Sequence, residues 1–432
     1  MRVERVDWEG GDAAAAARGL REAAPDTGEV AGAVAEIFRE VDQGGDDALR
    51  ELTRRLDGVE PAPDSLRVES GEVARALEGI ASDVRAAMEA AAANIHAVAE
   101  AELDASLPVE VGLGDGQRVA VAEAPVGAAG IYAPGGRAAY PSSVLMCCIP
   151  ARVAGVGRIA VASPPGPDGK LHPAVLSACA IGGADEVHAI GGAQAIAALA
   201  LGTQSVAAVD VIAGPGNRYV VEAKRLASRR VGIDGIAGPS ELVIVADRSA
   251  DPEWVALDLC AQAEHGTDGL LVVISTDGGL LDRVAALLPE LASGRPSVCD
   301  ASVAVVPAPG VTEALALADA LAPEHLELQL ETATEETARE RVAGCVLVGP
   351  CGATAFGDYA AGSNHVLPTG GAARFGRPLG PRTFMRRTSI VSISPTSATA
   401  LSPVVGALAR AEGFPVHAES AEARAGENGA SE

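Results

Sequence analysis

The amino-acid sequence predicts an α/β protein with two parallel sheets and helices on both faces of each. From about residue 118 onward, short runs of β-branched residues alternate with Ala-rich helical segments, as in strands joined by crossover helices. The chain has 432 residues, which is too many for one ordinary domain, so we expect two or three units. Because 48% of the residues are hydrophobic but only 3% are aromatic, the core must consist of Ala, Val, Leu and Ile.

The N-terminal part of the chain is expected to be helical. Residues 1–27 read as an Ala-rich arm with a short helix. Helical periodicity runs from Val30 to Leu56, interrupted by Gly44 and Gly45, and returns over residues 73–103.

A first α/β run follows. Its expected strands are 118–121, 130–132, 159–162, 186–190 and 210–212. Its expected helices are 142–153, 173–181, 193–201 and 217–227.

A second α/β run has a similar pattern. Its expected strands are 241–246, 270–275, 302–306, 326–329 and 345–348, with helices over 251–264 and 280–291. The segments "GRIAVASPPGPDG" and "DGLLVVISTDGG" resemble each other, which is a weak sign of a diverged repeat.

The C-terminal part is less regular. Residues 349–382 are rich in Gly, Pro, Thr and Asn and predict an ordered loop region. A helix is expected over 399–411, and residues 418–432 are expected to fray.

Charge and composition exclude some functions. A formal net charge of −25 repels phosphate backbones and anionic lipids, so neither nucleic-acid nor membrane partners are expected. The first ten residues carry no apolar signal core. The seven cysteines include no CxxC pair and fit a reducing compartment, so the expected location is the cytoplasm.

Histidines near polar residues are the first candidates for chemistry. Gln262 lies three residues before His265, so the two side chains leave one face of a helix and can converge on a cation. Taken alone, this pair is more typical of a helix end with a surface polar group. Glu324 and His325 begin a strand, where His325 could act as a base and Glu324 could activate water. Alone, they are more typical of a solvated strand entry.

Two further histidines lie in unusual surroundings. The segment "FGDYAAGSNHVLPTGG" combines Asp358 and His365 in a Gly-rich stretch, where buried polar groups are costly unless they bind something. Glu412 and His417 lie near the C-terminus, and His417 matters only if that tail docks into a site.

Three glycine-rich turns predict a candidate nucleotide site. "IYAPGGRAAYPSS", "IGGAQAIAAL" and "IAGPGNRYVVEAK" each read as a strand, a turn and a helix start, which exposes backbone N–H groups to an anion. No segment matches G-x-G-x-x-G, and no acidic ribose partner is evident.

Together these segments closely resemble the histidinol dehydrogenase family. The resemblance runs from about Val30 to His417 and rests on motifs in the family's order: "IYAPGGRAAYPSSVLM", "GGAQAIAALA", "AGPGNRYV", "AGPSEL", "AQAEHG", "APEHLEL", "GDYAAGSNHVLPT" and "AEGFPVH". It implies the zinc- and NAD-dependent, four-electron oxidation of L-histidinol through L-histidinaldehyde to L-histidine, the last steps of histidine biosynthesis.

The resemblance also implies residue roles. The implied zinc ligands, one ion per subunit, are Gln262, His265, Asp358 and His417. The implied catalytic residues are His325, as general base, and Glu324. Further substrate-binding residues are Ser240, His365 and Glu412, beside the zinc ligands and His325. The implied NAD-binding residues are Tyr132, Gln194 and Asn217.

The resemblance further implies an intertwined homodimer with incomplete Rossmann-like domains and shared active sites. We expect an N-terminal arm (1–27), a zinc and catalytic domain (28–127 with 241–380), an NAD-binding domain (128–240) and a C-terminal arm (381–432) that reaches the partner.

Two alternatives stay open at this point. One is a dehydrogenase of the same superfamily that acts on another small polar alcohol, such as a sulfonated diol. The other is a non-catalytic protein that binds metal or nucleotide. Cys147 and Cys148 could form a thiohemiacetal with an aldehyde, but both fall in an apolar helical run, which favours buried, inert thiols.

Overall fold

The computed structural model describes residues 1–22, 30–61, 66–105, 109–114, 116–135 and 138–425. The chain divides into two compact units. The first comprises Met1–Leu103 with Val126–Phe384, and the second comprises Asp104–Pro125 with Met385–Glu432. None of the helices in the described ranges has both the length and the apolarity to span a bilayer.

The first unit contains a five-stranded parallel sheet. Its strands are β4 (Ala128–Tyr132), β5 (Arg158–Ser163), β6 (Glu186–Ala189), β7 (Val211–Ala213) and β8 (Gly232–Ile233), in the order β6-β5-β4-β7-β8. The central strand β4 is buried along its whole length, because helices cover both faces of the sheet.

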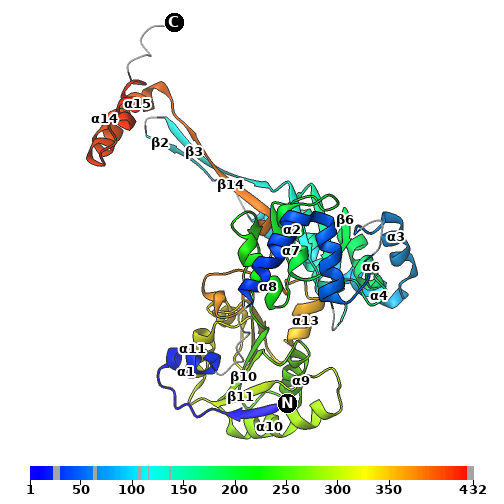
Figure 1. Ribbon diagram of the computed structural model, residues 1–432. Helices are drawn as coiled ribbons and strands as arrows, with labels where there is room; N and C mark the ends of the chain where they lie inside the picture. The colour runs from blue at the N-terminus through cyan, green and yellow to red at the C-terminus, as the bar shows by residue number, and fades with distance from the viewer. Residues whose placement is uncertain (23–29, 62–65, 106–108, 115, 136–137, 426–432) are drawn as a thin grey trace. The chain divides into compact units, whose positions relative to one another are not determined.

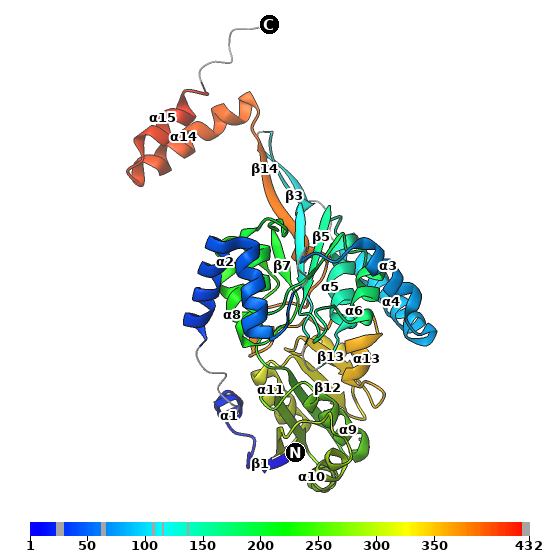
Figure 2. The ribbon, with the colours of Figure 1, turned by 45° about the vertical axis from the view of Figure 1, so that its right-hand side comes forward.

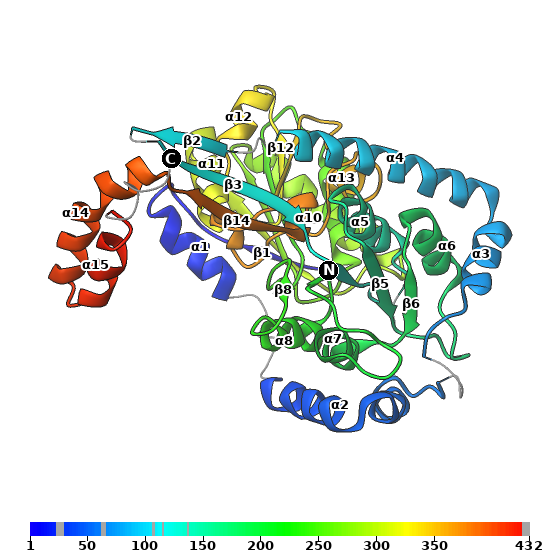
Figure 3. The ribbon, with the colours of Figure 1, turned by 90° about the horizontal axis from the view of Figure 1, so that it is seen from above.

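Helices cover both faces of this sheet. They are α5 (Pro141–Val153), α6 (Pro173–Gly182), α7 (Gly192–Leu201) and α8 (Arg218–Ala227). Figure 2 shows α5 and α6 on one side of the sheet and α8 on the other. The long helix α2 (Ala31–Leu52) packs outside α7 and α8 (Figure 3) and is kinked at Gly45, where φ is 53°. It continues into the short helix η1 (Thr53–Asp57). Helix α3 (Ser70–Gly79) packs on α6 and precedes α4 (Ser82–Asp104).

The first unit also contains a six-stranded parallel sheet. Its strands are β1 (Arg2–Arg5), β9 (Glu241–Ala246), β10 (Leu270–Ser275), β11 (Ser302–Pro307), β12 (His325–Gln329) and β13 (Cys345–Val348). Helices α9 (Pro252–Ala263) and α10 (Gly278–Ser293) share a core with one face, and α1 (Ala13–Glu22) and α11 (Val311–Leu321) with the other (Figure 1). Helix α12 (Glu335–Arg339) leads to β13, and α13 (Thr354–Tyr359) follows it.

The two parallel sheets share one topology. Counted in chain order, the five strands β4 to β8 are arranged 3-2-1-4-5, and so are the strands β9 to β13, with β1 added at the edge beside β11. This order is that of a Rossmann-like sheet without its sixth strand. The predicted α/β class with two incomplete Rossmann-like sheets is therefore confirmed, and the common order supports the repeat that the sequence indicated weakly.

The second unit is smaller. An antiparallel sheet joins β14 (Met385–Ser392), β3 (Gln117–Pro125) and β2 (Val109–Leu113). Helix α14 (Pro395–Ala411) packs against α15 (Pro415–Glu422). The expected fraying from residue 418 is wrong as far as Glu422, because Arg410 pairs with Glu422 and the Ser402 hydroxyl donates to the carbonyl of Ala421. Residues 426–432 lie outside the described part of the chain.

Further expectations differ from the structure. The strand 118–121, expected in the first parallel run, is part of β3 and lies in the antiparallel sheet. The stretch 349–382, expected to be a loop, contains α13 and the short helices η2 (Ala372–Arg374) and η3 (Pro381–Phe384). The strand β1 and the helix α11 were not expected at all. Helix α2 shares its core with the five-stranded sheet, which differs from the expected grouping of residues 28–127 with 241–380.

Candidate functional site

The candidate catalytic residues lie at the amino ends of two neighbouring strands. Ser240 directly precedes β9, and Glu324 and His325 stand at the start of β12, which pairs with β9. Ala322, with φ of 47°, ends α11 in a left-handed conformation that turns the chain into β12. Neighbouring strands thus bring residues from distant parts of the sequence to one edge.

His325 is buried and held from both ring nitrogens. Its Nε2 lies 3.1 Å from the Asp358 carboxylate, and its Nδ1 lies 3.3 Å from the carbonyl oxygen of Glu241. Burial lowers the pKa of His325, but the hydrogen bonds and charges of Asp358 and Glu324 outweigh it, so that the net pKa is well above its usual value. The ring is therefore fixed in orientation, with an oxygen acceptor facing each of its two nitrogens.

Glu324 belongs to a chain of polar contacts. Its carboxylate accepts hydrogen bonds from the Ser240 hydroxyl at 2.6 Å and from the backbone N–H of Glu241 at 2.8 Å. The Gln262 amide of α9 donates to the same hydroxyl. Three predicted site residues, Ser240, Gln262 and Glu324, thus lie in direct contact.

Glu241 joins the elements of this edge, and its role was missed from the sequence. Its carboxylate, 4% exposed, accepts hydrogen bonds from both terminal nitrogens of Arg21 on α1. It also accepts from the backbone N–H groups of Glu324 and Gly370. Glu241 begins an otherwise apolar strand and therefore did not stand out as a site residue. A charged residue in an apolar strand is costly to bury, and that was the available sign of its role.

Asp358 lies on α13, whose first turn is anchored from β12. The Glu327 carboxylate accepts from both the backbone N–H and the hydroxyl of Thr354, each at 2.8 Å. This anchoring explains why a helix forms where a loop was expected. Burial raises the pKa of Asp358, but the hydrogen bond and charge of His325 and the charges of His365 and His265 bring it below its usual value.

His365 bridges the two sheets of the first unit. Its Nδ1 lies 2.8 Å from the carbonyl oxygen of Asp358, and its Nε2 lies 3.2 Å from the hydroxyl of Ser143 on α5. Beside it, the Asn364 amide donates to the carbonyl of Met146 at 2.6 Å. Burial lowers the pKa of His365, which favours the neutral ring.

The candidate cofactor residues lie at the carboxyl edge of the five-stranded sheet. The Tyr132 hydroxyl, at the end of β4, accepts from the backbone N–H of Gly192 at 3.0 Å. Asn217 caps α8 by accepting from the N–H groups of Tyr219 and Val220. This edge, between β4 and β7, is the switch point at which Rossmann-like sheets bind dinucleotides.

Two features of this edge suit a bound dinucleotide. The Gln194 side chain is fully buried, and its Oε1 has no hydrogen-bond partner among the described residues. A Cβ added to Gly214, where φ is 118°, would lie only 2.1 Å from the carbonyl oxygen of Tyr132. The edge thus offers a buried acceptor and a close backbone turn.

Glu412 and His417 belong to the second unit. Glu412 caps the C-terminal end of α14, and His417 is exposed on α15, its ring 5.5 Å from that of Phe414. The other predicted site residues lie in the first unit.

Only some of the predicted zinc ligands lie close to one another. Within the described ranges no group of three or more His, Cys, Asp or Glu side chains has the arrangement of a metal site. Gln262 and Asp358 nevertheless flank the Ser240–Glu324–His325 contacts, and the charge of His265 acts on Asp358. An amide oxygen, an imidazole nitrogen and a carboxylate oxygen form a donor set that fits zinc, although amide ligands are uncommon.

Cys147 and Cys148 are fully buried on α5, as expected of inert thiols. Burial raises the pKa of both thiols well above its usual value. Neither is therefore suited to attack an aldehyde.

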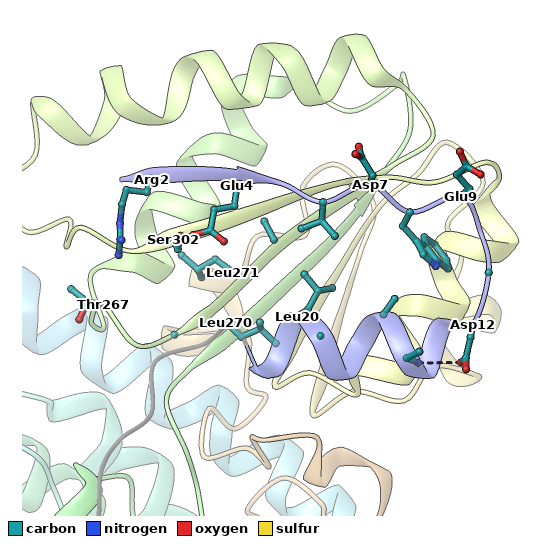
Figure 4. Close-up of a pocket in the computed structure, with 18 residues that line it drawn as sticks. Arg2, Glu4, Asp7, Glu9, Asp12, Leu20, Thr267, Leu270, Leu271 and Ser302 are labelled. Carbon is teal, nitrogen blue, oxygen red and sulfur yellow. Dashed lines mark hydrogen bonds between the residues drawn. The ribbon is translucent and has the colours of Figure 1, made fainter.

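A cavity of about 750 Å³ lies elsewhere in the first unit. Residues of β1 and α1 line it together with Leu270 and Leu271 of β10, and Asp12 caps the start of α1 beside it (Figure 4). Its described lining includes none of the predicted site residues.

Comparison with known proteins identifies the family. The sequence profile of histidinol dehydrogenase matches residues 20–425. The chain is 44% identical over 412 residues to the histidinol dehydrogenase of Ruegeria pomeroyi, covering 94% of this chain and 93% of that protein. It is 46% identical over 400 residues to that of Aromatoleum aromaticum, covering 91% and 90%. The crystal structure of histidinol dehydrogenase from Elizabethkingia anophelis matches with a TM-score of 0.89 at 29% identity, over 98% of both chains. The chain belongs to the histidinol dehydrogenase family.

Proposed function

We propose that this protein oxidises L-histidinol through L-histidinaldehyde to L-histidine at the amino edge of β9 and β12, with NAD as hydride acceptor and one zinc ion per subunit. The observation that carries the proposal is the buried His325, held by Asp358 at 3.1 Å, with Glu324 as its chain neighbour. A positioned imidazole beside a carboxylate suits the removal of a hydroxyl proton.

The zinc ion would be held by Gln262, His265 and Asp358 of one subunit and by His417. Bound there, it would supply a Lewis acid that holds the amino and imidazole nitrogens of the substrate. The proposal is supported by the donor set and by the contacts that join Gln262, Ser240 and Glu324.

His325 is proposed to act in both oxidations. In the first, the neutral form of His325 accepts the hydroxyl proton of histidinol at Nε2 while a hydride leaves the carbinol carbon for the nicotinamide. In the second, Glu324 and His325 together remove a proton from the water that adds to the aldehyde, and the resulting hydrate transfers a second hydride to a second NAD. Retaining the aldehyde between the two steps keeps a reactive carbonyl from solvent.

Ser240, His365 and Glu412 are proposed to hold the substrate. The contact between His365 and Ser143 supports this, because it fixes the imidazole beside Asp358. An imidazole-bearing amino alcohol fits a carboxylate and a histidine better than a sulfonated diol does, because a sulfonate would face the negative charge of Glu412.

NAD is proposed to bind at the carboxyl edge of the five-stranded sheet, on Tyr132, Gln194 and Asn217. The unpartnered Gln194 Oε1 supports this. Residues 128–240 would then serve as the cofactor domain and residues 241–380 as the catalytic part.

The protein is further proposed to act as an intertwined homodimer in the cytoplasm. In such a dimer the C-terminal arm would bring Glu412 and His417 to the partner's site. An amino-acid biosynthetic enzyme with free cysteines suits a reducing compartment.

The proposal is tested by following NADH to completion with a limiting amount of L-histidinol. We expect two NADH per histidinol, loss of the rate on chelation and its return with zinc. One NADH per histidinol with free aldehyde accumulating would contradict the two-step oxidation. Faster turnover of dihydroxypropanesulfonate would favour the alternative substrate class, and binding of NAD without turnover of either alcohol would favour a non-catalytic role.

A further inference from the structure

The five-stranded sheet lacks the carboxylate that Rossmann-like sites place at the end of their second strand. That carboxylate accepts hydrogen bonds from the adenosine ribose of NAD and excludes the 2′-phosphate of NADP. The second strand here is β5, which ends at Ser163 and continues into Pro164. Neither residue has a carboxylate that could accept hydrogen bonds from the ribose.

A carboxylate from elsewhere in the sequence reaches the same edge. Asp57 is the last residue of η1, and the left-handed Gly58 ends that helix. A Cβ built on Gly191 would lie 3.4 Å from Asp57 Oδ1 and 2.6 Å from the Cβ of Pro164. The Asp57 carboxylate therefore stands beside the turn after β6 and the end of β5.

Asp57 is in contact with the proposed cofactor residues. Its Oδ2 accepts a hydrogen bond from the Gln194 amide at 3.1 Å. Its negative charge adds to burial in raising the pKa of the Tyr132 hydroxyl. Among the described residues, no other side chain donates to the Asp57 carboxylate, so Oδ1 is left as an acceptor.

The cost of burying this carboxylate also points to a ligand. Burial raises the pKa of Asp57 to about 6 against the lowering effect of Gln194, so the group is ionised at pH 8 without an ion pair. The neighbouring basic residues Arg54 and Arg55 pair instead with Glu60, Glu51 and Glu40. An ionised, half-buried carboxylate beside an unpartnered amide oxygen can accept hydrogen bonds from the two hydroxyls of a ribose.

We propose that Asp57 binds the ribose diol of the adenosine half of NAD and sets the preference for NAD over NADP. This rests on the proposed cofactor site at Tyr132, Gln194 and Asn217. A carboxylate accepts from both hydroxyls of the diol and repels a 2′-phosphate, so one side chain provides both affinity and discrimination.

The test measures NADH and NADPH binding at pH 8 by calorimetry, without turnover. The unaltered protein should bind NADPH at least about 10-fold more weakly than NADH. Asp57→Asn should weaken NADH binding about 10–100-fold, the range for lost charge-assisted hydrogen bonds, with NADPH affinity unchanged or improved. Glu60→Gln, an exposed carboxylate three residues away, is the matched control and should change neither affinity.

The outcomes separate this proposal from the cofactor site on which it rests. If Gln194→Ala and Asn217→Ala weaken NADH binding but Asp57→Asn keeps the parent ratio of the two affinities, the ribose assignment is overturned and the site stands. If Asp57→Asn weakens the binding of NADH and of NADPH equally, Asp57 does not discriminate at the 2′ position of the ribose. If none of the three variants changes NADH binding, the cofactor site itself is wrong. Equal affinity of the unaltered protein for both cofactors overturns the ribose assignment without any variant.

Discussion

His325 shows how a single residue gains a role from three different elements. Glu241 of β9 faces its Nδ1, Asp358 of α13 faces its Nε2, and Glu324 precedes it in the chain. These contacts fix the plane of the ring and the direction in which each nitrogen points. Orientation of this kind is what distinguishes a catalytic histidine from a solvated one at a strand entry.

Replacing His325 should therefore affect chemistry more than metal. We expect His325→Ala to lower the turnover number with L-histidinol by about 10²–10⁴-fold, the usual contribution of a general base. Steady-state NADH formation measures the rate, and inductively coupled plasma spectrometry measures bound zinc, which should stay at the parent level. Full activity in this variant would contradict the assigned base.

Replacing His265 should have the opposite pattern. We expect His265→Ala to lose most of its zinc, and its activity with it, because one of few ligands is removed. The matched control is His96→Ala, since His96 is an exposed histidine of α4 beside Glu100. If the His265 variant retains zinc as the His96 variant does, His265 is not a ligand.

At the residue scale, the sequence pattern indicated polar residues but not their contacts. Helical spacing paired Gln262 with His265, but α9 ends at Ala263, so His265 lies in the turn beyond the helix. No local pattern could reveal that His365 meets Ser143, 222 residues away. Nor could it show that Glu241, inside an apolar run, accepts from Arg21 of a distant helix.

At the scale of elements, α13 depends on a buried pair of acids. Glu327 of β12 accepts from Thr354 at the start of α13 and shares a hydrogen bond with Asp258 of α9. These contacts join a strand and two helices directly behind Asp358 and Gln262. Two carboxyl groups in contact can share one proton but cannot both ionise cheaply.

This pair predicts a pH dependence of stability. Burial, then the charge and hydrogen bond of Glu327, raises the pKa of Asp258 to about 8, whereas an unfolded Asp ionises near pH 4. Stability from the folded-state proton is fully present below about pH 4 and is lost as pH rises through about 8. We expect the free energy of unfolding to fall with pH over this window by up to about 1.4 kcal/mol per pH unit for one proton.

Asp258→Asn tests this directly, because an amide keeps the hydrogen bond but cannot ionise. Urea unfolding at pH 6, 7 and 8 should show a smaller loss of stability in this variant than in the parent. Glu253→Gln, which alters an exposed carboxylate on the same helix, should keep the parent's slope. Equal slopes for Asp258→Asn and the parent would show that the pair does not hold the proton.

Elements with a strong local pattern were predictable. The strands Glu241–Ala246, Leu270–Ser275 and Cys345–Val348 match their expected bounds, because continuous β-branched runs end at polar or glycine residues. Strand β1 was not predictable, because four largely exposed residues become a strand only by pairing with β11. Helix α11 was predictable, because apolar residues recur at helical spacing in it. These are Ala314, Leu317, Ala318 and Leu321.

At the scale of the whole molecule, one topology serves two purposes. Both parallel sheets have the order 3-2-1-4-5. The five-stranded sheet presents its candidate cofactor residues at the carboxyl edge, as Rossmann-like sheets do. The six-stranded sheet presents its candidate catalytic residues at the amino edge. His365 and Asn364, in contact with Ser143 and Met146 of α5, connect the two.

The second unit contains His417 and Glu412, which we propose to act in the site of the partner subunit. A shared site of this kind makes a definite prediction for mixed dimers. A His325→Ala subunit paired with a His417→Ala subunit would form one site with both changes and one site with neither.

The most direct measurement is therefore the activity of that mixed dimer, isolated by a different affinity tag on each subunit after co-expression. The account predicts about half the parental activity per dimer, because one of two sites is intact, whereas each variant alone is nearly inactive. A mixed dimer as inactive as the two variant homodimers would contradict a site shared between His325 of one subunit and His417 of the other.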